Sequence, residues 1–374
     1  MNFYASGSLA DVLPSALAVL GVPGSPDPLG LAAGLEGVNR VAVLLVDGLG
    51  WLQLPATAAF APTLAGFASA PSSRGLTSAF PSTTPVSLVT AGTGVPPGAH
   101  GILGFNLRVP DTGTVLNHLR WTDEPDPARW QPVPTVFSRA AAAGIAASVV
   151  TRPEFAGSGL TVAAYRGAHF RGASHVDGLV TEMLGALGGT ERALVYGYHP
   201  DVDRAGHQFG VDSPQWRAAV IEVDDLLRRL AEHLPPDAAL LVTADHGQVD
   251  VPAGRRFDLD ADPRLRAGVA QVAGEARLRY LHTVPGARDD VLAAWREILG
   301  PAAEVVTREE AVAAGWYGPV DPAHRERLGD VVAACRDDYV VLATATEPDT
   351  VTRMVAFHGS YTPVEMSIPL LVIR

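Results

Sequence analysis

A set of side chains suited to metal binding and nucleophilic attack stands at the ends of apolar runs or in turns of this chain. It comprises Asp47, Thr84, Asp203, His207, Asp245, His246 and His358. Three carboxylates, three imidazoles and a hydroxyl are the ligand types of a two-metal hydrolytic site. Taken singly, each residue has an ordinary structural role, because aspartate and threonine are common in turns and helix caps. Together they predict a metal-dependent hydrolytic centre.

Two motifs bring a carboxylate and an imidazole close together along the chain. In ADHG, Asp245 and His246 are adjacent, and Gly247 permits a turn tight enough to aim both at one ion. In DRAGH, Asp203 precedes His207 by one helical turn, which can place both on one side of a helix or loop. These spacings predict that each motif supplies one aspartate and one histidine as metal ligands.

Thr84, in FPSTTPVSL, is the candidate nucleophile. Pro85 suits the first turn of a helix over residues 86–94, so a capping role and a catalytic role are compatible. A helix N-terminus directs unpaired N–H groups at an anion such as a phosphoryl group. A threonine hydroxyl must be activated by a base or a metal ion, which the predicted cluster supplies. Thr83 is the alternative nucleophile.

The elements that must position these residues follow an α/β pattern, in which short apolar runs alternate with amphipathic stretches. The expected strands are residues 41–46, 147–151, 193–198, 239–243 and 368–373. Helices are expected at residues 134–143 and from Pro214 to Leu234, the latter with one apolar stripe. Ligands of open parallel sheets bind beyond the carboxyl ends of the strands. The aspartates that follow three of these strands are therefore expected at one edge of a mostly parallel sheet.

Residues 256–344 interrupt this pattern with strand and helix signals of their own, including LRYLHTV and a helix from Asp289 to Leu299. We expect a small inserted α+β subdomain there. The catalytic core would consist of residues 1–255 and 345–374.

Composition limits the partners that this chain can have. The 374 residues carry a net charge of -12, and all 28 basic residues are arginine, which argues against a scaffold for nucleic acids. Small phosphate substrates stay compatible, because bound metal ions reverse the charge of an acidic pocket. No apolar run reaches the roughly 18 residues of a membrane span. The sequence does not indicate an oligomeric state.

The single cysteine, Cys335, excludes an intrachain disulfide and fits a reducing compartment. The first 21 residues lack a basic segment and carry Asp11 among apolar residues, so we interpret them as a helix and not as a signal peptide. We therefore expect a cytoplasmic protein.

Together these motifs resemble the alkaline phosphatase superfamily, and specifically its nucleotide pyrophosphatase/phosphodiesterase branch. The local match begins at Thr84 and continues with TGVPPGAHG at residues 93–101. It goes on with VDRAGH at 202–207, DHG at 245–247 and HG at 358–359. The resemblance implies an alkaline-phosphatase-like core with an insertion where residues 256–344 stand.

The resemblance also implies a ligand set for two divalent metal ions, zinc first, with manganese or iron as alternatives. One ion would be bound by Asp203, His207 and His358. The other would be bound by Asp47, Asp245 and His246, with Thr84 as its reacting ligand. Thr84 would then attack phosphorus and form a phosphothreonine intermediate.

The substrate is less well defined by the sequence. Nucleotide-hydrolysing members carry ThrPheProAsn at the nucleophile, whereas AFPSTTP stands here, and the family's asparagine after HisGly has its approximate counterpart in Asn106, one position late. Asn106 and Arg74 are the candidate substrate-binding residues, and Arg204 is a further candidate cation. His199 is ambiguous, because it lies four residues before Asp203.

We expect a phosphodiesterase or nucleotide pyrophosphatase acting on a small phosphate ester. The alternatives are a phosphomonoesterase, a phosphonate hydrolase, or a metal-binding protein without catalysis. Trp121 and Trp130 would either stack on a nucleotide base or pack in the core.

Overall fold

The computed structural model describes residues 3–4 and 7–374, and its centre is a large sheet with the spatial order β2-β17-β8-β1-β7-β5-β6. The strands are β1 (Arg40–Val46), β2 (Arg74–Thr77), β5 (Ala146–Thr151), β6 (His169–Gly172), β7 (Ala193–His199), β8 (Ala238–Thr243) and β17 (Ser367–Ile373). β17 runs antiparallel to both of its neighbours, and the pairs formed by β1, β5, β6, β7 and β8 are parallel. The predicted α/β fold with a mostly parallel sheet is confirmed.

The strands form where apolar side chains can be buried on both faces of the sheet. Every residue from 41 to 46 in β1 is buried, which is typical of a parallel strand covered by helices on both sides. All five predicted strands are present. The edge strands β2 and β6 were not predicted, because RGLT and HFRG are short and largely polar or exposed.

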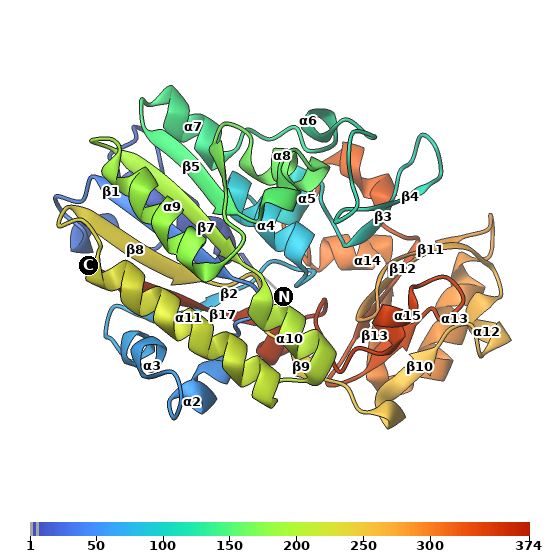
Figure 1. Ribbon diagram of the computed structural model, residues 1–374. Coiled ribbons are helices and arrows are strands. Elements are labelled where there is room, and N and C mark those ends of the chain that lie inside the picture. The colour runs from blue at the N-terminus through green and yellow to red at the C-terminus, as the bar shows by residue number, and fades with distance from the viewer. Residues whose placement is uncertain (1–2, 5–6) are drawn as a thin grey trace.

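Helices cover both faces of this sheet (Figure 1). One face carries α3 (Pro62–Ala68), α9 (Val176–Gly188) and α11 (Pro214–Glu232). The other carries α1 (Val12–Val19), α4 (Thr84–Thr93), α7 (Val136–Ala142) and α8 (Gly159–Tyr165). The helix in the first 21 residues is thus α1, within the part of that segment that the structure describes.

The two helices predicted from sequence have recognisable start signals. α11 begins at Pro214, and the hydroxyl of Ser213 accepts a hydrogen bond from the N–H of Trp216. It ends at Glu232, so Leu234 lies beyond it. α7 begins two residues later than predicted, because Thr135 caps its first turn.

Residues 256–344 contain a second sheet, which lies beside the central sheet in Figure 1. Its order is β11-β12-β14-β13, with β11 (Val269–Glu275), β12 (Leu278–Thr283), β13 (Ala303–Thr307) and β14 (Val331–Cys335), all antiparallel. α13 (Arg288–Leu299) packs on it through the buried Trp295. The predicted strand and helix of this region are confirmed as β12 and α13, whereas the limits of the inserted subdomain stay a prediction.

Two short strands join the second sheet to the core. The chain leaves through β9 (Val249–Asp250) and returns through β16 (Ala356–Phe357), and these strands pair antiparallel. Their pairing brings the segment after His246 next to the segment before His358. His246 and His358, which are far apart in sequence, are thus brought close together.

The remaining elements are short or connect the two sheets. They are α2 (Leu54–Thr57), α5 (Pro97–His100), α6 (Pro127–Trp130), α10 (Asp201–Phe209), α12 (Pro263–Arg266), α14 (Arg308–Ala313), α15 (Asp349–Thr352), α16 (Pro363–Met366), β3 (Asn106–Arg108), β4 (Val115–Asn117), β10 (Arg256–Asp258) and β15 (Val340–Leu342). Among the described helices, none combines the length and apolar character needed to cross a membrane.

Candidate metal centre

The carboxyl ends of three neighbouring strands bring the predicted aspartates together. Asp47 follows β1, Asp245 follows β8, and Asp203 lies in α10, just after β7. The N–H of Asp203 donates to the carbonyl of Asp47 (3.1 Å), and the N–H of Gly48 donates to Oδ1 of Asp245 (3.0 Å). Gly48 has φ +75°, and a Cβ there would lie 2.8 Å from Cα of Asp203, so the close approach requires glycine.

One cluster of ligand atoms consists of Asp203, His207 and His358. Nε2 of His207 lies 3.3 Å from Oδ2 of Asp203 and 3.2 Å from Nε2 of His358. Each ring donates its Nδ1 hydrogen to a backbone carbonyl, His207 to Ala356 (2.8 Å) and His358 to Ser82 (2.8 Å). In the neutral rings, two Nε2 lone pairs therefore face each other, an arrangement that a cation between them stabilises.

The second cluster consists of Asp47, Asp245 and His246, all buried. Nε2 of His246 lies 3.4 Å from Oδ2 of Asp245 and 3.6 Å from Oδ1 of Asp47. These two carboxylate oxygens are shielded from solvent and have no hydrogen-bond partner in the described structure. Buried, unpaired carboxylate oxygens are costly unless a cation binds them, so this donor set fits a divalent metal ion.

The two clusters are adjacent. The rings of His246 and His358 stack with their centroids 3.5 Å apart and an angle of 13° between their planes. One ligand of each cluster therefore packs directly on a ligand of the other. The six predicted metal ligands form one continuous centre.

The carboxylates gathered in this centre require a positive charge beside them in order to ionise together. Burial raises the pKa of Asp47 well above its ordinary range, and the nearby carboxylates of Asp245 and Asp203 raise it further. Burial lowers the pKa of His358 well below its ordinary range, with His246 and His207 acting in the same direction. The neutral imidazole is the form that binds metal, and a bound cation would allow the carboxylates to ionise together.

The structure distinguishes between the two candidate threonines. Thr84 is the first residue of α4, and its Oγ1 lies 3.3 Å from Nε2 of His246 in the second cluster. Thr83 turns the other way, and its hydroxyl donates to Oε2 of Glu275 (3.1 Å). Thr84 is therefore the hydroxyl placed at the candidate metal ligands.

The predicted substrate-binding residues have other partners. Arg74, on β2, donates to the carbonyl of Leu29 (2.5 Å). The side-chain amide of Asn106 donates to the carbonyl of Gly274 (2.8 Å) and accepts from Asn117 (2.9 Å). No contact of either with the ligand clusters is seen in the described structure, so their predicted substrate role stays a prediction.

The two tryptophans proposed for base stacking are buried. Trp121 donates its indole N–H to the carbonyl of Pro125 (2.8 Å), and Trp130 donates to Nε2 of His118 (3.1 Å). Arg327 covers the ring of Trp130, 3.6 Å from its centroid. Of the two alternatives, packing in the core is therefore confirmed.

Two orienting residues were not predicted from sequence. The hydroxyl of Tyr198 donates to Oδ2 of Asp47, and burial together with Asp47 keeps the pKa of this tyrosine well above its ordinary value. Gln248 donates to Oδ1 of Asp203 (2.6 Å). Their positions, at the end of β7 and just after DHG, are the only sequence signals that point to them.

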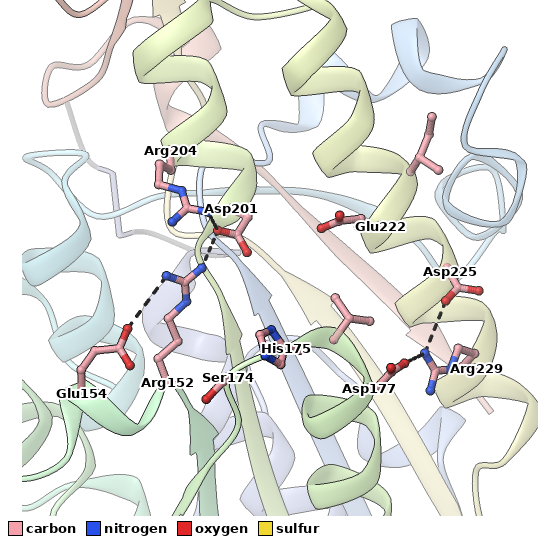
Figure 2. A pocket seen from close by; sticks show the side chains of 12 residues that line it. Arg152, Glu154, Ser174, His175, Asp177, Asp201, Arg204, Glu222, Asp225 and Arg229 are labelled. Carbon is pink, nitrogen blue, oxygen red and sulfur yellow. Dashed lines mark hydrogen bonds and ion pairs between the residues drawn. The ribbon is translucent and has the colours of Figure 1, made fainter.

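A cavity of about 640 Å³ lies at the start of α10, and none of the candidate metal ligands lines it (Figure 2). Arg152 and Arg204 both bond Oδ1 of Asp201 there. His199, Asp201 and Glu222 form a third group of ligand-type atoms, with Nε2 of His199 4.0 Å from Oδ2 of Asp201. Because two arginines already balance Asp201 and Glu222 is exposed, we do not assign a metal ion to this group.

A buried ion pair ties the second sheet to the loops that carry the ligands. Arg277 donates through Nε and one terminal nitrogen to the two oxygens of Glu365 (2.7 Å each). Glu365 in turn accepts from the N–H of Ser360 (3.0 Å) through its side chain and from that of Gly247 (2.9 Å) through its carbonyl. The ligand loops at His246 and His358 are thus held by a residue from the predicted insertion.

Solved structures with a similar fold include murine ectonucleotide pyrophosphatase/phosphodiesterase 5, with a TM-score of 0.71 and 19% identity over 89% of this chain and 87% of the other. Another is phosphonoacetate hydrolase from Sinorhizobium meliloti 1021 in complex with phosphonoacetate, with a TM-score of 0.69 and 21% identity over 90% of each chain. At these identities the likeness shows the fold.

Sequence comparison gives the family. An uncharacterized pyrophosphatase/phosphodiesterase of Schizosaccharomyces pombe is 27% identical over 192 residues, which are 48% of this chain and 39% of that protein, so the match spans about two fifths of that relative's length. The family model of type I phosphodiesterase / nucleotide pyrophosphatase matches residues 41–361. The resemblance inferred from the motifs is confirmed, and the chain belongs to the type I phosphodiesterase / nucleotide pyrophosphatase family.

Proposed function

We propose that this protein is a metal-dependent hydrolase of small phosphoric diesters that uses Thr84 as its nucleophile. The observation that carries the proposal is the position of Thr84 Oγ1, 3.3 Å from Nε2 of His246, beside two adjacent clusters of metal-ligand type. The N-terminus of α4 starts at the same residue, so its N–H groups favour an anion there. Membership of the family supports hydrolysis of a phosphoric ester.

We propose that the centre binds two zinc ions, with manganese or iron as alternatives. One would be bound by Asp203, His207 and His358, and the other by Asp47, Asp245 and His246, with Thr84 beside it. When bound, the ions supply positive charge that stabilises phosphoryl oxygens in the transition state and activates hydroxyl groups near them.

The residues of the chain orient and carry out the two displacements. Oγ1 of Thr84 loses its proton and forms a bond to phosphorus while the bond to the leaving oxygen breaks, and the departing alkoxide takes up a proton to give the alcohol. Water then loses a proton and attacks phosphorus, the bond to Thr84 breaks, and Oγ1 of Thr84 takes up a proton, which leaves a phosphoric monoester. Tyr198 and Gln248 hold the carboxylates of Asp47 and Asp203 in place during both steps.

The distribution of arginines supports a diester as the substrate. A monoester carries an additional negative oxygen, which an arginine at the site would balance. The two candidate cations are engaged elsewhere, Arg74 with the carbonyl of Leu29 and Arg204 with Asp201. A singly charged diester is therefore the better match.

We expect the zinc-loaded protein to hydrolyse bis(p-nitrophenyl) phosphate with a kcat/KM about tenfold or more above that for p-nitrophenyl phosphate, the ratio that corresponds to about 1.4 kcal/mol. The measurement is steady-state release of p-nitrophenolate with both esters at equal zinc concentration. A preference for the monoester would overturn the diester assignment and move the protein to phosphomonoester hydrolysis. A lack of turnover of both esters and of phosphonoacetate by zinc-loaded protein would favour a binding protein.

Phosphonate hydrolysis is the second candidate, because one solved structure with this fold is a phosphonoacetate hydrolase. Phosphonoacetate therefore belongs in the same panel, with release of inorganic phosphate as the readout. Turnover of phosphonoacetate above that of the diester would replace the proposal by this alternative.

A further inference from the structure

Glu275 lies beside the nucleophile segment although it comes from the second sheet. It is the last residue of β11, and its Oε2 accepts the 3.1 Å hydrogen bond from the hydroxyl of Thr83. Its Oε1 is shielded from solvent and has no hydrogen-bond partner among the described residues. Thr83 directly precedes Thr84, so this carboxyl group contacts the residue next to the proposed nucleophile.

The carboxyl group is held in place by the loop that follows His358. Gly359 has φ +122°, and a Cβ at this residue would lie 2.7 Å from Cδ of Glu275. The hydroxyl of Ser82 accepts from the N–H of Gly359 (3.2 Å) and donates to the carbonyl of Ser360 (2.6 Å). Glu275 therefore lies between the segment that carries Thr84 and the loop that follows His358.

The hydroxyl of Thr83 lacks the capping hydrogen bond that its position at the start of α4 favours. Thr83 is the N-cap residue of α4 and has extended backbone angles, φ -133° and ψ 144°. A threonine hydroxyl in this place usually accepts a hydrogen bond from an N–H of the first helical turn. The hydroxyl makes no such bond here, because the side chain points to Glu275, to which it donates. Of the N–H groups that such a hydroxyl could cap, only that of Val86 is present, because Pro85 has none and the N–H of Ser87 donates to the carbonyl of Thr83.

We propose that Glu275 is a positioning residue that holds the Thr83 hydroxyl away from the N-terminus of α4 and so keeps the N–H of Val86 open to the phosphoryl group at Thr84. This inference rests on the proposed function of Thr84. Without an acceptor at position 275, Thr83 caps α4 and competes with the substrate for the N–H of Val86. Burial raises the pKa of Glu275 to about 8, and the protonated group still accepts through Oε2.

The test compares four variants of the zinc-loaded protein: Glu275→Leu, Glu275→Gln, Thr83→Val and the double variant Glu275→Leu/Thr83→Val. Glu275→Leu removes the acceptor at similar volume, and we expect kcat/KM for bis(p-nitrophenyl) phosphate to fall about 10- to 100-fold. Glu275→Gln retains an acceptor, and Thr83→Val removes the competing hydroxyl, so each should stay within about threefold of the unchanged protein. The double variant should recover about tenfold or more over Glu275→Leu.

Recovery by the second substitution separates this role from a merely structural one, because a packing defect at Glu275 would not be repaired by removing the Thr83 hydroxyl. Full activity of Glu275→Leu, or a double variant as impaired as Glu275→Leu, would overturn the inference. Should the leucine variant fail to fold, Glu275→Ala removes the acceptor without adding bulk, and the same comparison applies.

Binding of inorganic phosphate, measured by calorimetry on the zinc-loaded variants, separates failure of this inference from failure of the proposed function. If the unchanged protein hydrolyses neither ester but its phosphate affinity falls in Glu275→Leu and returns in the double variant, the proposed function fails and the role of Glu275 stands. If the unchanged protein is active and neither readout responds to these variants, the role of Glu275 fails alone.

Discussion

Replacing Thr84 by alanine is expected to lower kcat for the preferred ester by about 10⁴-fold or more, the scale seen when a catalytic nucleophile is removed. Oγ1 of Thr84 is the atom that the proposed mechanism bonds to phosphorus, and it lies 3.3 Å from Nε2 of His246. Metal content should stay unchanged, because three protein ligands remain in each cluster. The measurements are steady-state kinetics and metal analysis of the purified variant.

Two matched variants serve as controls for this loss. Thr84→Ser retains a hydroxyl at the same place and should keep most of the activity that Thr84→Ala loses. Thr83→Val removes the neighbouring hydroxyl, which donates to Glu275. Retention of most activity by Thr84→Ala, or a loss in Thr83→Val as large as in Thr84→Ala, would contradict the assignment of the nucleophile.

Replacing His358 by alanine should remove one metal ion and lower kcat/KM by more than about 100-fold, beyond the 10- to 100-fold effect of residues that only orient ligands. Nε2 of His358 lies 3.6 Å from Oδ1 of Asp203 and 3.2 Å from Nε2 of His207, so its loss leaves two donors in the first cluster. The measurement is zinc stoichiometry by elemental analysis together with kcat/KM.

His199→Ala is the matched control, since His199 is also a buried histidine near Asp203 but belongs to neither cluster. It should keep both ions and most of the activity. An unchanged stoichiometry in His358→Ala, or an equal loss in His199→Ala, would contradict the division of the ligands between the two clusters.

The placement of Asp47, Asp203, His207 and Asp245 was predictable because each has a local sequence signal. Asp47 and Asp245 end apolar runs that became β1 and β8, and DRAGH gave the helical spacing of Asp203 and His207. His358 lacked a partner nearby in sequence. It reaches the others through the pairing of β9 with β16, which no local pattern reveals.

Other parts of the site depend on contacts between distant segments. The sequence favoured Thr84 but kept Thr83 as the alternative, because two adjacent hydroxyls before a proline look alike until Glu275 and His246 are seen on opposite sides. Glu275 itself stands in no motif and reaches the site only through the second sheet. Arg74 looked close to the nucleophile in sequence, but its guanidinium bonds the carbonyl of Leu29.

The most direct test of the central claim is mass spectrometry of the protein after rapid acid quenching during turnover of bis(p-nitrophenyl) phosphate. Attack by Thr84 expels one p-nitrophenolate and leaves a p-nitrophenyl phosphoryl group on the threonine. We predict this adduct on the peptide that contains Thr84, and its absence from Thr84→Ala. An adduct on Thr83, or rapid turnover by Thr84→Ala without any adduct, would contradict the account.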